Sequence, residues 1–126
     1  MAKQYGGIDI ALAAYDDLSS SQWLFVKMNG NDTADLCSAA TDVVIGVLQD
    51  EGSTGQGLNV RVMGHSKVYL AATVAAGALV GTHTDGRATT ITAGTSTTAY
   101  VAGRCIVGGD TGDVGEIVLI PSGRAA

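Results

Sequence analysis

The chain has 126 residues and a net charge of -5, with only 7 Lys and Arg, and this length suits one domain. Nucleic-acid affinity depends on clustered basic residues that neutralise phosphates, so we expect no nucleic-acid partner. No segment approaches the run of about 18 apolar residues that spans a membrane, and no basic segment followed by an apolar one opens the chain. We therefore expect a soluble protein that has no membrane partner and is not exported through a signal peptide.

The composition favours a β protein with a small core. The chain contains 18 Gly and 1 Pro, which is typical of a chain that turns often between strands. Its hydrophobic fraction is 46%, but much of it is alanine and there is only 1 Phe and 1 Trp. Because alanine buries little apolar area, we expect a core whose stability would gain from oligomerisation.

Residues 1–22 differ from the rest of the chain and are predicted to form an N-terminal arm. Ile8, Ile10 and Leu12 alternate with other residues as in a strand, although a short helix over residues 11–18 fits the same stretch. The arm has two possible placements, because such a segment either folds back on its own domain or docks on a neighbouring molecule.

Residues 23–126 are predicted to form the β domain, and their first unit is a hairpin. The strand begins at Trp23 and runs into the turn signal Asn29-Gly30. The segment ADLCSA, residues 34–39, is expected to pair back across that turn.

The central unit, residues 43–70, predicts two paired strands joined by the glycine-rich segment DEGSTGQG. In the second strand Leu58, Val60 and Val62 alternate with polar residues, which places these three side chains in the core. Arg61 is accordingly expected on the solvated face. The pattern continues beyond Gly64, so we expect the sheet to continue as well.

The remaining chain predicts a second hairpin and two closing strands. Asp85-Gly86 is the turn of the hairpin, and residues 92–99 are expected to form a surface loop. Residues 100–107 and 116–120 are the closing strands, the last of them buried on both faces. Seven or eight short strands at this spacing indicate a compact β-barrel or sandwich.

The cysteines and histidines do not indicate a catalytic or metal-binding site. Cys37 and Cys105 are expected to be reduced and buried, since the chain lacks a signal peptide. His65 is expected in a turn and His83 at a strand end, because neither lies in a metal-binding spacing.

The acidic and glycine-rich segments do not indicate a calcium site, a phosphate-binding loop or a hydrolase active site either. Asp110, Asp113 and Glu116 are interpreted as solvated turn acids, because their spacing does not match a calcium loop. No hydrolase elbow motif and no phosphate-binding loop is present. We therefore expect no metal, no cofactor and no catalysis.

The order of three segments resembles the small phage head-decoration, or capsid cement, proteins. These segments are GVLQDEGSTGQGLNVRVMG, KVYLAATVAAGALVGTHTDGRATT and YVAGRCIVGGDTGDVGEIVLIPSG. The resemblance covers roughly residues 23–123. It implies a small single-domain, β-tulip-like barrel with an extended N-terminal arm.

The resemblance also implies a structural function. A protein of this kind binds the outside of an icosahedral head as a homotrimer and cements neighbouring major capsid subunits against internal DNA pressure. It belongs to the virion and is made and assembled in the host cytoplasm. The residues proposed to contact the capsid or a neighbouring subunit are Tyr5, Ile8, Ile10, Leu12 and Trp23. The alternative is a virion-surface module that recognises a host glycan or receptor, which exposed aromatic residues would favour.

Overall fold

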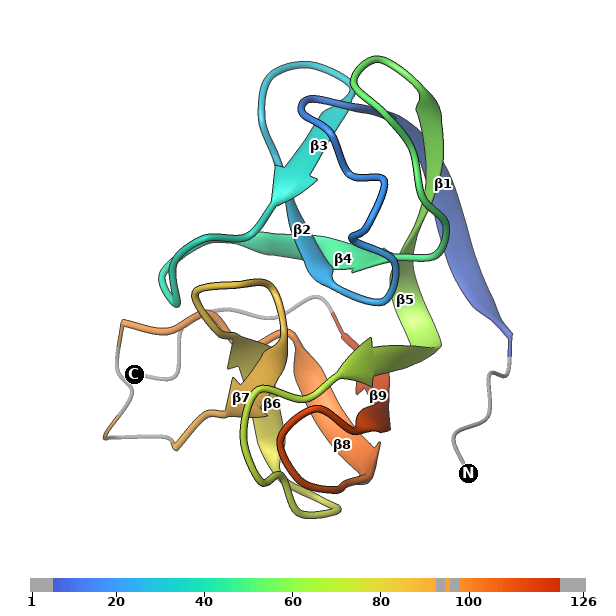
Figure 1. Ribbon diagram of the computed structural model, residues 1–126. Helices are drawn as coiled ribbons and strands as arrows, with labels where there is room; N and C mark the ends of the chain where they lie inside the picture. Colours follow the sequence, from blue (N-terminus) through green and yellow to red (C-terminus); the bar gives the residue numbers. More distant parts are fainter. Residues whose placement is uncertain (1–5, 93–94, 96–97, 121–126) are drawn as a thin grey trace.

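The computed structural model describes residues 6–92, 95 and 98–120, and all the regular structure in this part of the chain is β (Figure 1). The expected mainly β fold is confirmed, and the described residues include no helix. Nine strands follow one another, rather than seven or eight: β1 (Gly7–Ala14), β2 (Phe25–Met28), β3 (Thr33–Leu36), β4 (Val44–Leu48), β5 (Gly57–Tyr69), β6 (Leu79–Thr82), β7 (Ala88–Thr90), β8 (Gly103–Val107) and β9 (Val114–Leu119).

The strands form two halves that share β5. The order β1-β3-β2-β4-β5 closes on itself through pairing of β1 with β5, which makes a five-stranded barrel. The order β5-β9-β8-β6-β7 continues from the other end of β5 as a second sheet. Figure 1 shows the barrel in the upper half of the view and the second sheet in the lower half, with β5 running through both.

The bend at Gly64 lets β5 serve both halves. Gly64 pairs with Gly7 of β1 on one side and with Leu119 of β9 on the other. Its φ of +98° lies in the left-handed region, and a Cβ there would stand 2.8 Å from the Cα of Gly7. Only glycine accepts both constraints. The strand therefore changes partners at this residue without breaking.

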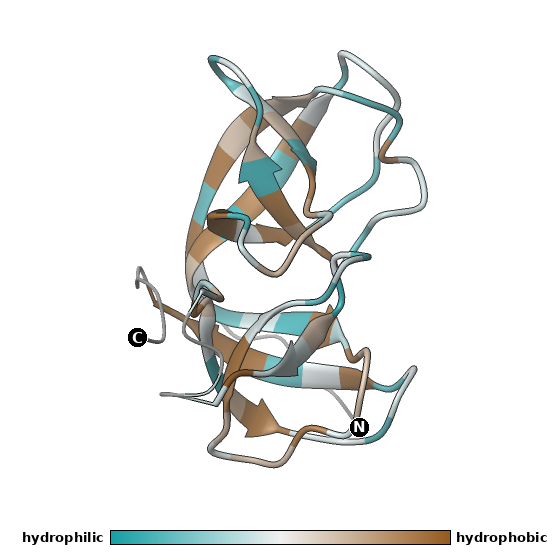
Figure 2. Cartoon of the chain, turned by 90° about the vertical axis from the view of Figure 1, so that its left-hand side faces the viewer, coloured by the Kyte–Doolittle hydropathy of each residue, from teal (hydrophilic) through white to brown (hydrophobic). Residues whose placement is uncertain are grey.

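Each half has its own hydrophobic core. The barrel core contains Leu12, Ala14, Leu18, Val26, Ala34, Leu48, Leu58 and Val60. The second core lies between the barrel and the second sheet and includes Phe25, Val47, Val68, Leu70 and Ile117. Hydrophobic and hydrophilic residues accordingly alternate along the strands (Figure 2). Because successive side chains of a strand point to opposite faces, Phe25 and Val26 enter different cores.

The predicted hairpins are confirmed. β2 pairs with β3 around a turn in which Gly30 has φ +89°, and β6 pairs with β7 around a turn in which Gly86 has φ +84°. Parts of residues 92–99, the expected surface loop, lie outside the described residues. The last strand ends at Leu119, and Ile120 is 49% exposed, so the expectation that this segment is buried on both faces is wrong at its end.

The N-terminal segment differs most from the prediction, because it is a strand of the barrel and not an arm. Residues 7–13 of the expected arm pair with β5 from Gly57 to Gly64, and Leu12 belongs to the barrel core. The domain therefore does not begin at residue 23, because β1 closes the barrel. The sequence suggested no partner for Leu12, since its neighbour Leu58 is remote in sequence and such pairing leaves no local signal.

Candidate functional site

The described residues show a cluster of exposed apolar side chains where the barrel meets the second sheet. Ile8, Ile10, Met63 and Ile120 are 56%, 37%, 41% and 49% exposed, respectively. Next to them lies a groove of about 300 Å³. It is lined by Ile10, Val44, Ile45, Val62, Met63, Tyr100, Ala102, Leu119 and Ile120, and we name it the junction groove. None of these side chains is charged, so the groove offers apolar contact.

The path of β5 explains why this surface is concave. β4 pairs with β5 only at Val47 and Leu48, and beyond Gly64 β5 pairs with β9 instead. The two halves therefore diverge around residues 62 and 63. β1 pairs with β3 only at Ala13 and Ala14, so β5 is the one described strand that pairs with the first part of β1. The exposed isoleucines of β1 thus stand at the edge of the groove.

Arg61 fixes β1 beside this groove. Its Nε lies 2.6 Å from Oδ1 of Asp9, its Nη2 lies 3.2 Å from Oδ2, and its Nη1 donates to the carbonyl of His65 at 2.9 Å. The side chain of Arg61 is 13% exposed. The expectation that Arg61 lies on a solvated face is therefore wrong, because its side chain lies against Asp9 of the paired strand β1 and the carbonyl of His65.

His65 and Glu116 form a buried pair in the second sheet. His65 Nε2 lies 2.8 Å from Glu116 Oε1, and the two residues are 8% and 3% exposed. His65 is therefore not in a turn but inside β5, and Glu116 is not a solvated turn acid but a residue of β9. The sequence held one sign that Glu116 belongs to a strand, because Glu116 directly precedes the apolar run IVLI.

Trp23 lies away from the junction groove and links the two halves. Its N–H donates to the carbonyl of Leu48, and its own carbonyl accepts from the N–H of Tyr69. Its φ is +65°, which is unusual for a bulky residue. The half-buried ring packs against the second core, and the ammonium of Lys67 stands 5.3 Å from its centroid. These contacts give Trp23 a structural role within the chain.

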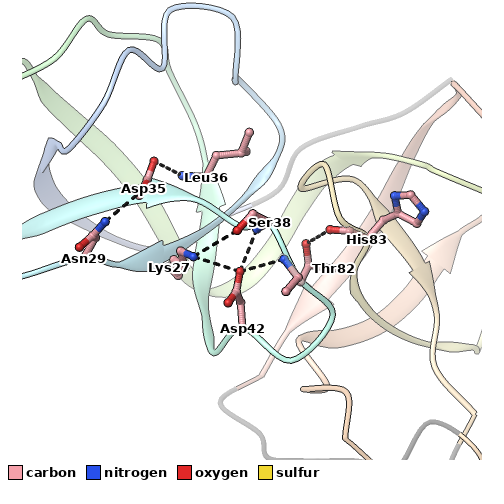
Figure 3. Close-up of polar contacts among 9 residues, drawn as sticks. Lys27, Asn29, Asp35, Leu36, Ser38, Asp42, Thr82 and His83 are labelled. Atoms are coloured by element: carbon pink, nitrogen blue, oxygen red, sulfur yellow. Dashed lines mark hydrogen bonds and ion pairs between the residues drawn. The ribbon is translucent and has the colours of Figure 1, made fainter.

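A polar cluster stabilises the connection between β3 and β4 (Figure 3). Oδ2 of Asp42 accepts from the N–H groups of Ser38 and Ala39 at 2.8 and 3.0 Å, and it lies 3.2 Å from the Lys27 ammonium. Burial alone raises the pKa of Asp42, but these hydrogen bonds and the Lys27 charge outweigh it and keep that pKa below its ordinary value. The cluster therefore holds the loop between β3 and β4 in its conformation.

The described residues include no group of three His, Cys, Asp or Glu side chains able to hold a metal ion. Cys37 and Cys105 are free thiols buried in the second core. Burial, with a contribution from the Asp42 carboxylate, raises the pKa of Cys37 to about 12, and burial also raises the pKa of Cys105. Both thiols are thus protonated at neutral pH, which disfavours nucleophilic chemistry. The part of the chain that the structure describes contains no helix long and apolar enough to cross a membrane.

The structure brings together only two of the five predicted contact residues. Ile8 and Ile10 lie beside the junction groove, whereas Leu12 is in the barrel core and Trp23 is half-buried elsewhere. Tyr5 lies outside the described residues. The sequence missed Met63 and Ile120, which the non-local pairing of β5 with β1 and β9 brings to the same place.

A second apolar surface lies on β8. The register between β8 and β9 shifts between Cys105 and Val107, and this bulge leaves Ile106 and Val107 44% and 40% exposed. We name this pair the β8 bulge. It is opposite Glu116, four residues before Ile120, and so stands about 13 Å along β9 from the junction groove.

The fold is similar to that of a phage head protein. A crystal structure of the head fiber gp8.5 N base of bacteriophage phi29 superposes with a TM-score of 0.66 at 17% sequence identity. The match covers 92% of this chain and 96% of the phi29 chain. No protein-family model and no curated protein matches the sequence. The likeness therefore establishes a shared fold over almost the whole of both chains.

Proposed function

We propose that this chain is a structural protein of a phage virion that binds the outer surface of an icosahedral head. The observation that carries this proposal is the fold shared with a phage head fiber base over nearly the full length of both chains. The order of glycine-punctuated strands that resembles the head-decoration proteins supports the same conclusion from the sequence. In this function the chain cements neighbouring major capsid subunits as a homotrimer.

The surface chemistry suits this role. The chain carries a net charge of -5, which favours the outside of a head over its DNA-lined interior. Ile8 is the most exposed of the isoleucines near the groove, and it sits where β1 emerges from the barrel. We place the capsid contact at this end of β1, because an exposed apolar cluster marks an interaction site in a soluble protein.

The test uses heads of the source phage assembled without this protein. Purified chain should bind them in a saturable, stoichiometric manner, and bound heads should resist heat or loss of divalent cations better than bare heads. Ile8→Asp should weaken binding at least tenfold and leave the melting temperature of the free protein unchanged. Tyr15→Asp, at a residue 52% exposed outside the cluster, is the matched control.

Absence of saturable binding to heads would overturn the proposal. Binding without any gain in head stability would remove the cementing role and keep the structural attachment. If the protein instead bound host cells or their surface glycans without binding heads, the recognition module would replace the structural protein as the function.

A further inference from the structure

The first half of β1 is paired on one side only. Residues 7–12 pair with β5, whereas β3 reaches β1 only at Ala13 and Ala14. Figure 1 shows this part of β1 at the outer right-hand edge of the molecule, with β5 on its inner side. Residues 7–11 are all exposed, whereas Leu12 is buried. Few buried contacts therefore hold residues 7–11, and segments of this kind open at a lower free energy than the core around them.

A side-chain contact fastens this half of β1 to β5. Arg61 holds the Asp9 carboxylate through Nε and Nη2, at 2.6 and 3.2 Å, and its Nη1 donates to the carbonyl of His65 at 2.9 Å. The register between β1 and β5 shifts between Ile8 and Asp9, so the contact lies where the backbone ladder is irregular. We name the Asp9 carboxylate, the Arg61 guanidinium and the His65 carbonyl the β1 latch.

We propose that the first half of β1 opens and closes locally, and that Arg61 is the positioning residue that keeps it closed. This inference rests on the proposed function, because the closed segment is the one that contacts the capsid. In the closed state Ile8 and Ile10 complete the exposed apolar cluster beside the junction groove. In the open state they leave β5, and Met63 and Ile120 remain without them. The cluster that a head recognises is thus assembled only while the β1 latch is closed.

Amide hydrogen exchange of the free protein, followed residue by residue by NMR, tests the local opening. The N–H of Ala14 donates to the carbonyl of Gln56, before β5, and backbone groups alternate along a strand, so the N–H groups of Leu12 and Ile10 also point toward β5. After correction for intrinsic rates, Ile10 should exchange at least about tenfold faster than Leu12. Low urea concentrations should speed exchange at Leu12 but not at Ile10, because local opening exposes little surface.

Variants separate the β1 latch from the stability of the whole domain. Asp9→Asn removes the charged partner of Arg61 and should speed exchange at Ile10 about tenfold, since hydrogen bonds to charged groups are the strong ones. Glu51→Gln removes one negative charge at an exposed residue between β4 and β5, and this matched control should leave Ile10 unchanged. Val68→Ala, in the second core, should give the opposite pattern. It should speed exchange at Leu12, through global unfolding, and leave Ile10 unchanged.

Two results would overturn the inference. If Ile10 and Leu12 exchanged at the same rate and with the same urea dependence, β1 would open only together with the barrel. If Asp9→Asn left exchange at Ile10 at its wild-type rate, the ion pair would not be what keeps the segment closed.

Binding to heads that lack this protein then tests which state makes the contact. The opening constant Kopen follows from exchange at Ile10, and if only the closed segment binds, the Kd for heads rises in proportion to 1 + Kopen. A latch variant that opens more and binds heads more tightly would show that the open segment makes the contact, which contradicts the inference.

The two measurements also separate this inference from the proposed function. Local opening controlled by Asp9 in a protein that does not bind heads would refute the proposed function and leave the β1 latch in place. Head binding that Ile8→Asp abolishes, in a protein without local opening, would refute the β1 latch and leave the proposed function standing.

Discussion

At the residue scale, Arg61 is the side chain that ties β1 to the rest of the barrel. It makes a two-pronged contact with Asp9 and a third bond to the carbonyl of His65 while it is largely covered. Hydrogen bonds to charged groups contribute about 1.5–3 kcal/mol each, and partial exposure of Asp9 lowers that value. We therefore expect Arg61→Ala to lower the free energy of unfolding by about 1–3 kcal/mol in urea titrations. The exposed Arg104→Ala, which should change it by less than about 0.5 kcal/mol, is the control.

The buried thiols make the free energy of unfolding fall at alkaline pH. The pKa of Cys37 is raised from an ordinary 9.0 to about 12 by burial first and by the Asp42 carboxylate second. The unfolded chain loses this proton near pH 9 and the folded chain retains it, so stability is complete below that pH and falls as pH rises toward 12. The expected loss is about 1.4 kcal/mol per pH unit within this window.

Urea unfolding at about pH 8 and about pH 10 measures this loss. Cys37→Ala starts from a lower stability, because it leaves a small cavity, but it should lose less stability between the two pH values than the wild type. The raised pKa of Cys105 accounts for a remaining slope. Parallel losses in the two proteins would show that folding does not raise the pKa of Cys37.

At the element scale, β1 has one end buried in the barrel core and the other end exposed at the surface. Leu12 is 6% exposed in the barrel core, whereas Ile8 is 56% exposed on the same strand. Leu12→Ala should therefore cost about 2–5 kcal/mol of stability, because it leaves a cavity in a closed barrel. Ile8→Ala should cost less than about 0.5 kcal/mol. Equal shifts in chemical denaturation midpoints would mean that β1 is not held in the barrel as the structure has it.

The elements that could be predicted from the sequence are those whose partners are close along the chain. The hairpins β2–β3 and β6–β7 follow from turn chemistry at Gly30 and Gly86, where positive φ is required. The pairing of β1 with β5 joins Asp9 and Arg61 across 52 residues, and no local pattern encodes it. The junction groove was unpredictable for the same reason, since it exists only after β1, β5 and β9 have met.

The polar pair His65–Glu116 shows a different limit of the sequence. The sequence predicted a turn at His65, whereas β5 continues through Gly64 and includes His65 among its buried residues. Burial depends on what covers a face, which is a property of the assembled sheet. Glu116 lies 51 residues from His65, and the bond between them becomes visible only when β5 and β9 are side by side.

At the scale of the whole molecule, two cores are joined by shared elements rather than by a linker. β5 contributes Leu58 and Val60 to the barrel core and Val68 to the second core. β2 divides Phe25 and Val26 between the same two cores. Neither half can lose its packing without releasing a strand that the other half needs. We therefore expect the protein to unfold as one cooperative unit.

Matched cavities in the two cores test this cooperativity. Leu48 lies in the barrel core and Leu70 in the second core, and both are 0% exposed. Each Leu→Ala variant should lose about 2–5 kcal/mol. In each variant, fluorescence of the single Trp23, which packs against the second core, should change at the same urea concentration as far-UV circular dichroism, which reports all strands. If Leu48→Ala shifted the circular dichroism transition but left that of Trp23 at its wild-type midpoint, the halves would unfold separately and β5 would not couple them.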